Sequence, residues 1–163
     1  MMSDDATAAP QPFKIPESVL VVIHTPDLQV LMMERADKPG FWQSVTGSKD
    51  RLSEALVETA MREVAEETGI VIGNADDAVP LSCLRDWQLA NDYEIYPVWR
   101  ARYAPGVTRN TEHVFSLEVP VGTLVTLAPR EHLQSCWLPY REAADRCFSP
   151  SNAEAILQLP RHL

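Results

Sequence analysis

The chain has 163 residues, of which 45% are hydrophobic and 23% charged, a composition typical of a soluble globular protein with one domain. Its formal net charge of −9 argues against nucleic-acid binding through phosphate contacts, and its longest apolar run, residues 19–23, is too short to cross a membrane. The three cysteines are odd in number and lack CxxC spacing, so we expect neither a disulfide framework nor a zinc site, and we expect a reducing cytoplasm.

The N-terminal residues 1–12 are acidic and rich in Ala and Pro, and they lack the basic and apolar regions of a signal peptide. They are predicted to form a flexible lead before a single domain over 13–163. Residues 18–24 follow as a continuously apolar, β-branched run. Such a run is typical of a strand that is buried on both faces of a sheet.

Turn residues and hydrophobic periodicity predict the other elements. Further strands are predicted, in chain order, over 30–34, 41–46, 94–102, 113–119 and 133–138. Helices are predicted from an N-cap at Ser53 to a stop at Gly69, from Pro139 to about Cys147, and from Pro150 or Ser151 toward Leu159. A loop over 71–80 follows the first helix. Strands and helices alternate without strict regularity, which predicts an α/β fold with a mixed sheet between helices.

The first predicted helix carries three glutamates near its C-terminal end: Glu63, Glu66 and Glu67. Negative charge is unfavourable there, because the helix dipole places partial negative charge at that end and the acids repel one another. At 100° per residue, Glu67 falls inside the apolar stripe of the helix and Glu63 at its edge, whereas Glu66 and Arg62 lie outside. Carboxylates gathered at the margin of the core predict a site for a hard divalent cation such as Mg²⁺, with Arg62 orienting the acids through ion pairs.

The stretch around this helix resembles the Nudix box of hydrolases that cleave nucleoside-diphosphate-linked substrates. The resemblance rests on Glu54 and on the run Arg62-Glu63-Val64-Ala65-Glu66-Glu67-Thr68-Gly69-Ile70. The spacing from Gly47 to Glu54 is one residue longer than usual, and the usual glycine before Glu54 is absent. The carbonyl that would approach a metal is therefore that of Thr46, Gly47 or Ser48. The resemblance implies an α/β/α sandwich.

Other strings narrow the resemblance to the bacterial dihydroneopterin triphosphate pyrophosphatases of folate synthesis. They are Phe41-Trp42-Gln43-Ser44-Val45-Thr46-Gly47 and Tyr103-Ala104-Pro105-Gly106-Val107-Thr108-Arg109-Asn110-Thr111. By matching position, the resemblance implies Mg²⁺ as cofactor, with Mn²⁺ as an expected substitute, held by Glu63, Glu67 and Glu131. It implies catalytic roles for Glu63, Glu66, Glu67 and Arg62, and places substrate contacts at Lys14, Arg35, Thr46 and Ser149.

Each of these residues also has an ordinary structural interpretation. Without the resemblance, Arg35 would be read as a surface cap, Lys14 and Glu131 as solvated, and Thr46 as a strand former. For two further residues, Trp42 and Arg109, the sequence allows either of two roles. Trp42 either stacks on a flat ring or, as the better interpretation, packs in the core. Arg109 either binds phosphate or shapes its loop through an ion pair.

The implied reaction is hydrolysis of 7,8-dihydroneopterin triphosphate to the monophosphate and pyrophosphate, with Glu66 or Glu63 as general base. The expected partner is therefore a small-molecule triphosphate, with neither nucleic acid nor membrane, and the oligomeric state is left open. Two alternatives are a general nucleoside triphosphate pyrophosphatase or dinucleoside polyphosphate hydrolase, and a non-catalytic Nudix domain that senses a ligand. The second is disfavoured because all four box glutamates are present: Glu54, Glu63, Glu66 and Glu67.

Overall fold

One mixed sheet organises the part of the chain that the computed structural model describes, residues 13–163. Its seven strands are β1 (Glu17–His24), β2 (Gln29–Arg35), β3 (Trp42–Gln43), β4 (Val45–Ser48), β5 (Leu84–Glu94), β6 (Arg109–Glu118) and β7 (His132–Pro139). They run in the order β3-β2-β1-β6-β5, with β4 paired to β1 and β7 to β2. Only the β1–β6 pair is parallel among these strand pairs. The predicted flexible lead over 1–12 lies outside the described residues.

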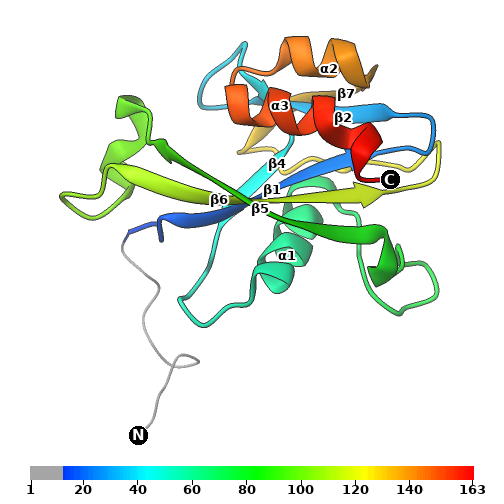
Figure 1. Ribbon diagram of the computed structural model, residues 1–163, viewed down its shortest axis with the longest axis horizontal. Helices are drawn as coiled ribbons and strands as arrows, with labels where there is room; N and C mark the ends of the chain where they lie inside the picture. Colours follow the sequence, from blue (N-terminus) through cyan, green and yellow to red (C-terminus); the bar gives the residue numbers. More distant parts are fainter. Residues whose placement is uncertain (1–12) are drawn as a thin grey trace, which may run out of the picture.

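Helices cover both faces of this sheet (Figure 1). The helix α1 (Leu56–Thr68) lies on one face, and α2 (Tyr140–Arg146) and α3 (Pro150–Gln158) lie on the other. Strand β1 supplies alternate side chains to both layers, because successive residues of a strand point to opposite faces. Val19 and Val21 join the core beneath α1, whereas Leu20 and Val22 join the core beneath α2 and α3. The α/β fold with a mixed sheet between helices is confirmed, as is the strand buried on both faces.

The start of α1 differs from the sequence prediction. Its N-cap is Ala55 rather than Ser53. Glu58 caps from inside the helix, its carboxylate accepting the Ala55 amide at 3.0 Å. Glu54 folds back instead, and its carboxylate accepts the Asp50 amide at 2.8 Å. The predicted end is confirmed, because Gly69 has a φ of 75° and its amide bonds to a carbonyl in the last turn.

The middle of the chain was predicted wrongly. The expected strand over 94–102 is instead the end of β5 followed by a 3₁₀ helix, η2 (Pro97–Arg102). Pro97 cannot donate to a strand ladder and starts this helix. The long strand β5 was missed because its pairing with β6 is interrupted by a bulge near Gln88, which has a φ of 53° and breaks the alternation of side chains.

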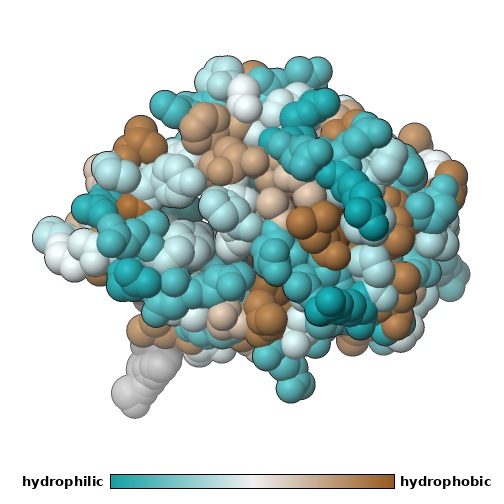
Figure 2. All heavy atoms as spheres, turned by 45° about the horizontal axis from the view of Figure 1, so that its top comes forward, coloured by the Kyte–Doolittle hydropathy of each residue, from teal (hydrophilic) through white to brown (hydrophobic). Residues whose placement is uncertain are grey.

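Two shorter 3₁₀ helices, η1 (Leu81–Cys83) and η3 (Leu159–Arg161), complete the described elements. On the face drawn in Figure 2, hydrophobic and hydrophilic residues are interspersed rather than gathered in one broad apolar patch. Among residues 13–163, no helix combines the length and apolar character needed to cross a membrane.

Candidate active site

Two of the three helix glutamates are buried where α1 meets β4. Glu63 and Glu67 are buried, whereas Glu66 is exposed, as the helical azimuths predict. Gly47 of β4 lies directly against Glu63, and a Cβ at this position would overlap the Glu63 carboxyl group. Glycine is therefore required at position 47 for the carboxylate to reach this place. Helix α1 and strand β4 therefore bring the Glu63 carboxylate directly against the backbone of Gly47.

Positive charge compensates these two acids only in part: Arg62 pairs with Glu63 at 3.1 Å, whereas Glu67 has no Lys or Arg ion-pair partner among the described residues. Burial raises the pKa of both Glu63 and Glu67, and the charges of Glu63 and Glu131 raise the pKa of Glu67 further. Oε1 of Glu67 has no hydrogen-bond partner among the described residues. Its basic neighbour His132 lies 3.9 Å away, and burial lowers the pKa of that imidazole to about 4, so it is neutral at pH 7.

This arrangement suits a divalent cation. Carboxylate oxygens are the ligands that Mg²⁺ prefers, and an unsatisfied buried carboxylate oxygen is costly without a cation. The carboxylates do not form a closed cage: among the residues described, no group of three or more Asp, Glu, His or Cys side chains has metal-binding spacing. Glu131 is exposed in the turn before β7, near enough to repel Glu67 electrostatically. The structure thus pairs Glu63 with Glu67 and leaves Glu131 at the rim.

Arg62 connects the acids of the motif. Its guanidinium donates to both oxygens of Glu54, each at 2.9 Å, and to Glu63 Oε2 at 3.1 Å. It also reaches Glu66 Oε1 at 3.3 Å and the Ser48 carbonyl at 3.0 Å. Glu54 is buried, and the Arg62 bonds hold its pKa down to about 2. The expected ion pairs to Glu63 and Glu66 are present; the stronger partner, Glu54, was missed because it lies eight residues away.

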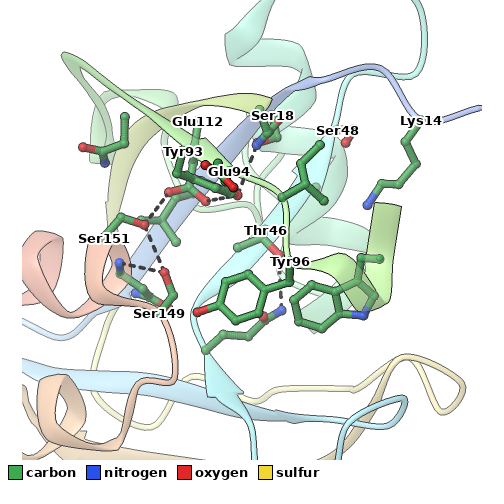
Figure 3. A pocket seen from close by; sticks show the side chains of 18 of the residues that line it. Lys14, Ser18, Thr46, Ser48, Tyr93, Glu94, Tyr96, Glu112, Ser149 and Ser151 are labelled. Carbon is green, nitrogen blue, oxygen red and sulfur yellow. Dashed lines mark hydrogen bonds between the residues drawn. The ribbon is translucent and has the colours of Figure 1, made fainter. Parts of the chain in front are cut away.

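Beside the acids opens a cavity of about 480 Å³, a size that suits a small ligand. All four predicted substrate residues line it: Lys14, Arg35, Thr46 and Ser149. Figure 3 places Lys14 on one side of the cavity and Ser149, Ser151 and Glu112 on the other, with Thr46 between them. Gly47 also lines the cavity, so the acid pair and the cavity share a wall.

The cations of the cavity are held in different ways. Lys14 is anchored by its backbone amide to the Arg102 carbonyl at 2.8 Å, and its ammonium points into the cavity in Figure 3. Burial of that ammonium lowers its pKa, as does Arg102, while Glu63 and Glu67 act in the opposite sense. Arg35 is half-buried against Trp99, 4.3 Å from its guanidinium carbon to the ring centroid.

Arg35 is also already paired. Its guanidinium binds both oxygens of Asp37, at 2.8 and 2.9 Å, and donates to Gln43 at 3.1 Å. The ion pair with Asp37 fits the structural interpretation of Arg35, and a phosphate bound at this residue would share the guanidinium with Asp37. Thr46 accepts a bond from Gln43 at 3.2 Å, and Ser149 is the N-cap of α3.

The two ambiguous residues take structural roles. Trp42 packs against the core cluster beneath α2 and α3, with Arg146 over its ring at 5.3 Å, and does not line the cavity. Arg109 forms an exposed ion pair with Asp92 at 2.8 Å. Of residues 104–111, which the sequence predicted as a loop, only Asn110 lines the cavity, and it lies on β6.

Sequence reasoning missed the remaining cavity wall. It comes from the end of β5 and from η2, with Tyr93, Tyr96 and Trp99, and from β6 with Glu112. The wrong strand assignment over 94–102 hid this wall. The signal that could have revealed it is Pro97, which separates a strand ending at Glu94 from the aromatic segment that follows.

We expect Glu131→Ala to raise the Mg²⁺ concentration needed for half-maximal rate by about tenfold, because it removes a charge beside Glu67. The melting temperature should stay within a few degrees, since Glu131 is exposed. Titrating Mg²⁺ against initial rate measures the effect, with the exposed acid Glu142→Ala on α2 as control. An unchanged Mg²⁺ requirement would assign Glu131 to the solvated surface.

Comparison with known proteins agrees with this geometry. A NUDIX domain profile matches residues 14–159. The chain is 40% identical over 157 residues to the dihydroneopterin triphosphate diphosphatase of Haemophilus influenzae, covering 96% of this chain and 94% of that one. It is 44% identical over 147 residues to the Escherichia coli protein of the same name, covering 90% and 93%.

Solved structures agree as well. The E. coli dihydroneopterin triphosphate pyrophosphohydrolase superposes with a TM-score of 0.81 at 42% identity, covering 94% of this chain and all of that one. A NUDIX hydrolase structure from Listeria monocytogenes matches with a TM-score of 0.68 at 24% identity over 91% of this chain and 92% of that one, which shows the shared fold. From its motif, its fold and these matches, the chain belongs to the NUDIX domain family.

Proposed function

We propose that this chain is a dihydroneopterin triphosphate diphosphatase, which hydrolyses 7,8-dihydroneopterin triphosphate to the monophosphate and pyrophosphate. The observation that carries the proposal is a single cavity with two chemically different ends. One end has Lys14 and Arg35 beside the buried acids, which suits a triphosphate with its cation. The other end has the aromatic side chain of Tyr93 and the polar side chains of Ser151 and Glu112, which suit a flat heterocycle with hydrogen-bonding groups. The relatives that carry this name are 40% and 44% identical over most of the chain.

The predicted metal-binding and substrate-binding residues have separable tasks. Glu63 and Glu67, with Glu131 at the rim, would hold the divalent ion, which we take to be Mg²⁺ with Mn²⁺ as a substitute. When bound, such an ion neutralises phosphate charge and acidifies a water molecule. Lys14 and Arg35 would orient the phosphate chain, Thr46 would donate a hydrogen bond from the middle of the cavity, and Ser149 would donate one from the side opposite Lys14.

A proton must leave the attacking water. Glu66 or Glu63 would accept it, and Arg62 holds both carboxylates, at 3.3 and 3.1 Å. The proposal also includes a small-molecule substrate rather than nucleic acid or membrane, and a cytoplasmic location. The three cysteines are free in the structure, which is consistent with a reducing compartment.

The test is a comparison of products and substrates. With Mg²⁺ present, phosphorus NMR should show pyrophosphate from the first time points, because one attack releases both outer phosphates together. The kcat/KM for dihydroneopterin triphosphate should exceed that for GTP, the best nucleotide, by at least about tenfold, as expected for a site that pairs polar groups on the ring. Early orthophosphate would indicate a phosphatase, and equal efficiency on dATP a general nucleotide hydrolase.

A further inference from the structure

Glu112 is a buried carboxylate at the end of the cavity away from Lys14 (Figure 3). It lies on β6, opposite Ser18 in the parallel pair with β1. Its Oε1 accepts a hydrogen bond from Ser151 at 3.0 Å, and its Oε2 is 3.5 Å from the Tyr93 hydroxyl, a long contact. A carboxylate can accept about four hydrogen bonds. Glu112 therefore has unused acceptor capacity facing the cavity.

No basic side chain in residues 13–163 forms an ion pair with this carboxylate. Burial raises the pKa of Glu112 to about 6, so the charged form predominates at pH 7 although it is costly there. A buried charge without a cation is stabilised when donors complete its hydrogen bonds. The cavity is the direction from which such donors can come.

The neighbours of Glu112 hold it in place. The Asn110 amide donates to the Tyr93 hydroxyl at 3.1 Å and to Ser18 Oγ at 2.7 Å. These bonds hold the Tyr93 hydroxyl next to the Glu112 carboxylate. Ser151 also contacts Ser149 Oγ at 3.0 Å. Three elements, β5, β6 and α3, therefore orient one acceptor group before any ligand binds, which lowers the entropic cost of binding.

We propose that Glu112 determines ring specificity by accepting two parallel hydrogen bonds from a 2-amino-4-oxopyrimidine edge. That edge carries an amino group next to a ring N–H, so it offers two adjacent donors to the two carboxylate oxygens. Pterins and guanine share it. Adenine and cytosine place their amino group beside an acceptor nitrogen, and uracil has one N–H between two carbonyls. The inference rests on the proposed function, because it assigns the ring to the end of the cavity opposite the phosphate cations.

The test compares GTP with ATP in Glu112→Gln, with Glu118→Gln on the same strand, outside the cavity, as the matched control. Glutamine replaces one acceptor with a donor, which faces a donor of the guanine edge. The ratio of kcat/KM for GTP to that for ATP should fall at least about tenfold in Glu112→Gln, as expected for a lost hydrogen bond to a charged group. It should be unchanged in Glu118→Gln. This ratio does not depend on the fraction of enzyme that is folded.

A binding measurement supports the kinetics. Neopterin, which carries the edge but no phosphate, should bind the metal-free wild type, and its affinity should fall by a similar factor in Glu112→Gln when followed by fluorescence titration. If Glu112→Gln yields no folded protein, Glu112→Asp withdraws the carboxylate by one methylene and serves in the same comparisons. A GTP-to-ATP ratio that is unchanged at position 112, or that falls equally in Glu118→Gln, overturns the proposal.

These outcomes separate the inference from the proposed function. If dihydroneopterin triphosphate proves no better than GTP, the proposed function fails, yet a ratio that depends on Glu112 still assigns the guanine-like edge to this carboxylate. If dihydroneopterin triphosphate has the higher kcat/KM and the GTP-to-ATP ratio does not change in Glu112→Gln, the proposed function stands and this inference fails.

Discussion

Glu67→Gln is expected to lower kcat/KM at saturating Mg²⁺ at least 100-fold, as for other losses of essential charge stabilisation. The substitution is nearly isosteric, but it removes a charge from a buried site where Oε1 has no protein partner among the described residues. Initial rates with and without EDTA measure the dependence, with Glu142→Gln on α2 as control. A wild-type rate in EDTA equal to the rate in Mg²⁺ would refute the metal site.

The same variant should change how stability depends on pH when metal is absent. The folded-state pKa values of Glu63 and Glu67 lie above their ordinary value of 4.5, that of Glu63 at about 7. The native state therefore binds more protons than the unfolded state between these values, and stability falls as pH rises through that range. Glu67→Gln removes one of the two groups and the repulsion between them.

Thermal unfolding in EDTA tests this expectation. The wild type should lose stability between about pH 4.5 and 7, and Glu67→Gln should lose less, so that the variant is at least as stable as the wild type at pH 7. Adding Mg²⁺ should raise the wild-type melting temperature at pH 7 more than that of the variant, by mass action on the native state. Parallel pH profiles for the two proteins would contradict the pairing of these acids.

The acid pair was predictable because its signal is local. Helical periodicity alone places Glu63 and Glu67 on the core side of α1 and Glu66 outside, and the burial in the structure agrees. The stop at Gly69 follows from the same stretch. Strand β1 was predicted for a similar reason, because a continuous apolar run bounded by turn residues by itself indicates a buried strand.

The ring end of the cavity was not predictable in the same way. Glu112, Tyr93 and Ser151 come from β6, β5 and α3, and no short window of sequence contains all three. The bulge near Gln88 broke the alternation that would have revealed β5. Glu54 shows the same limit within the motif, because its burial depends on a contact with Arg62 eight residues away and on the turn that precedes α1.

Arg62→Met should destabilise the fold by about 3 kcal/mol at pH 7, near the lower end for breaking a buried ion pair because Arg62 is partly solvated. Methionine keeps an apolar stem, so the interaction that is lost is chiefly the pair of guanidinium hydrogen bonds to the two Glu54 oxygens. That carboxylate would keep its bonds from Asp50 N and Thr59 Oγ1, at 2.8 and 2.9 Å, but not its cation. The melting temperature should fall by roughly 6–12 °C for a domain of this size.

The pH dependence of stability tests whether Glu54 accounts for the stability lost in Arg62→Met. The folded-state pKa of Glu54 is about 2, below its ordinary value of 4.5, so its stabilisation is present above pH 4.5 and is lost as pH falls toward 2. The wild type should lose this stability on acidification and Arg62→Met should not, so the two curves should converge near pH 2. Arg62→Lys, which keeps the charge without the two-pronged geometry, should lie between them. Stability curves of the wild type and Arg62→Met that stay parallel down to pH 2 would show that the loss of stability does not come from Glu54.

The double variant Glu54→Gln/Arg62→Met separates stability from catalysis. Removing the stranded charge should restore part of the stability lost in Arg62→Met, because the buried carboxylate is then neutral. It should not restore kcat, because Arg62 also bonds Glu63 Oε2 at 3.1 Å and the Ser48 carbonyl at 3.0 Å, which sets that acid against β4. We expect kcat to stay at least about tenfold below wild type in both variants at temperatures where both are folded. Recovery of kcat together with stability would show that Arg62 acts on the fold alone.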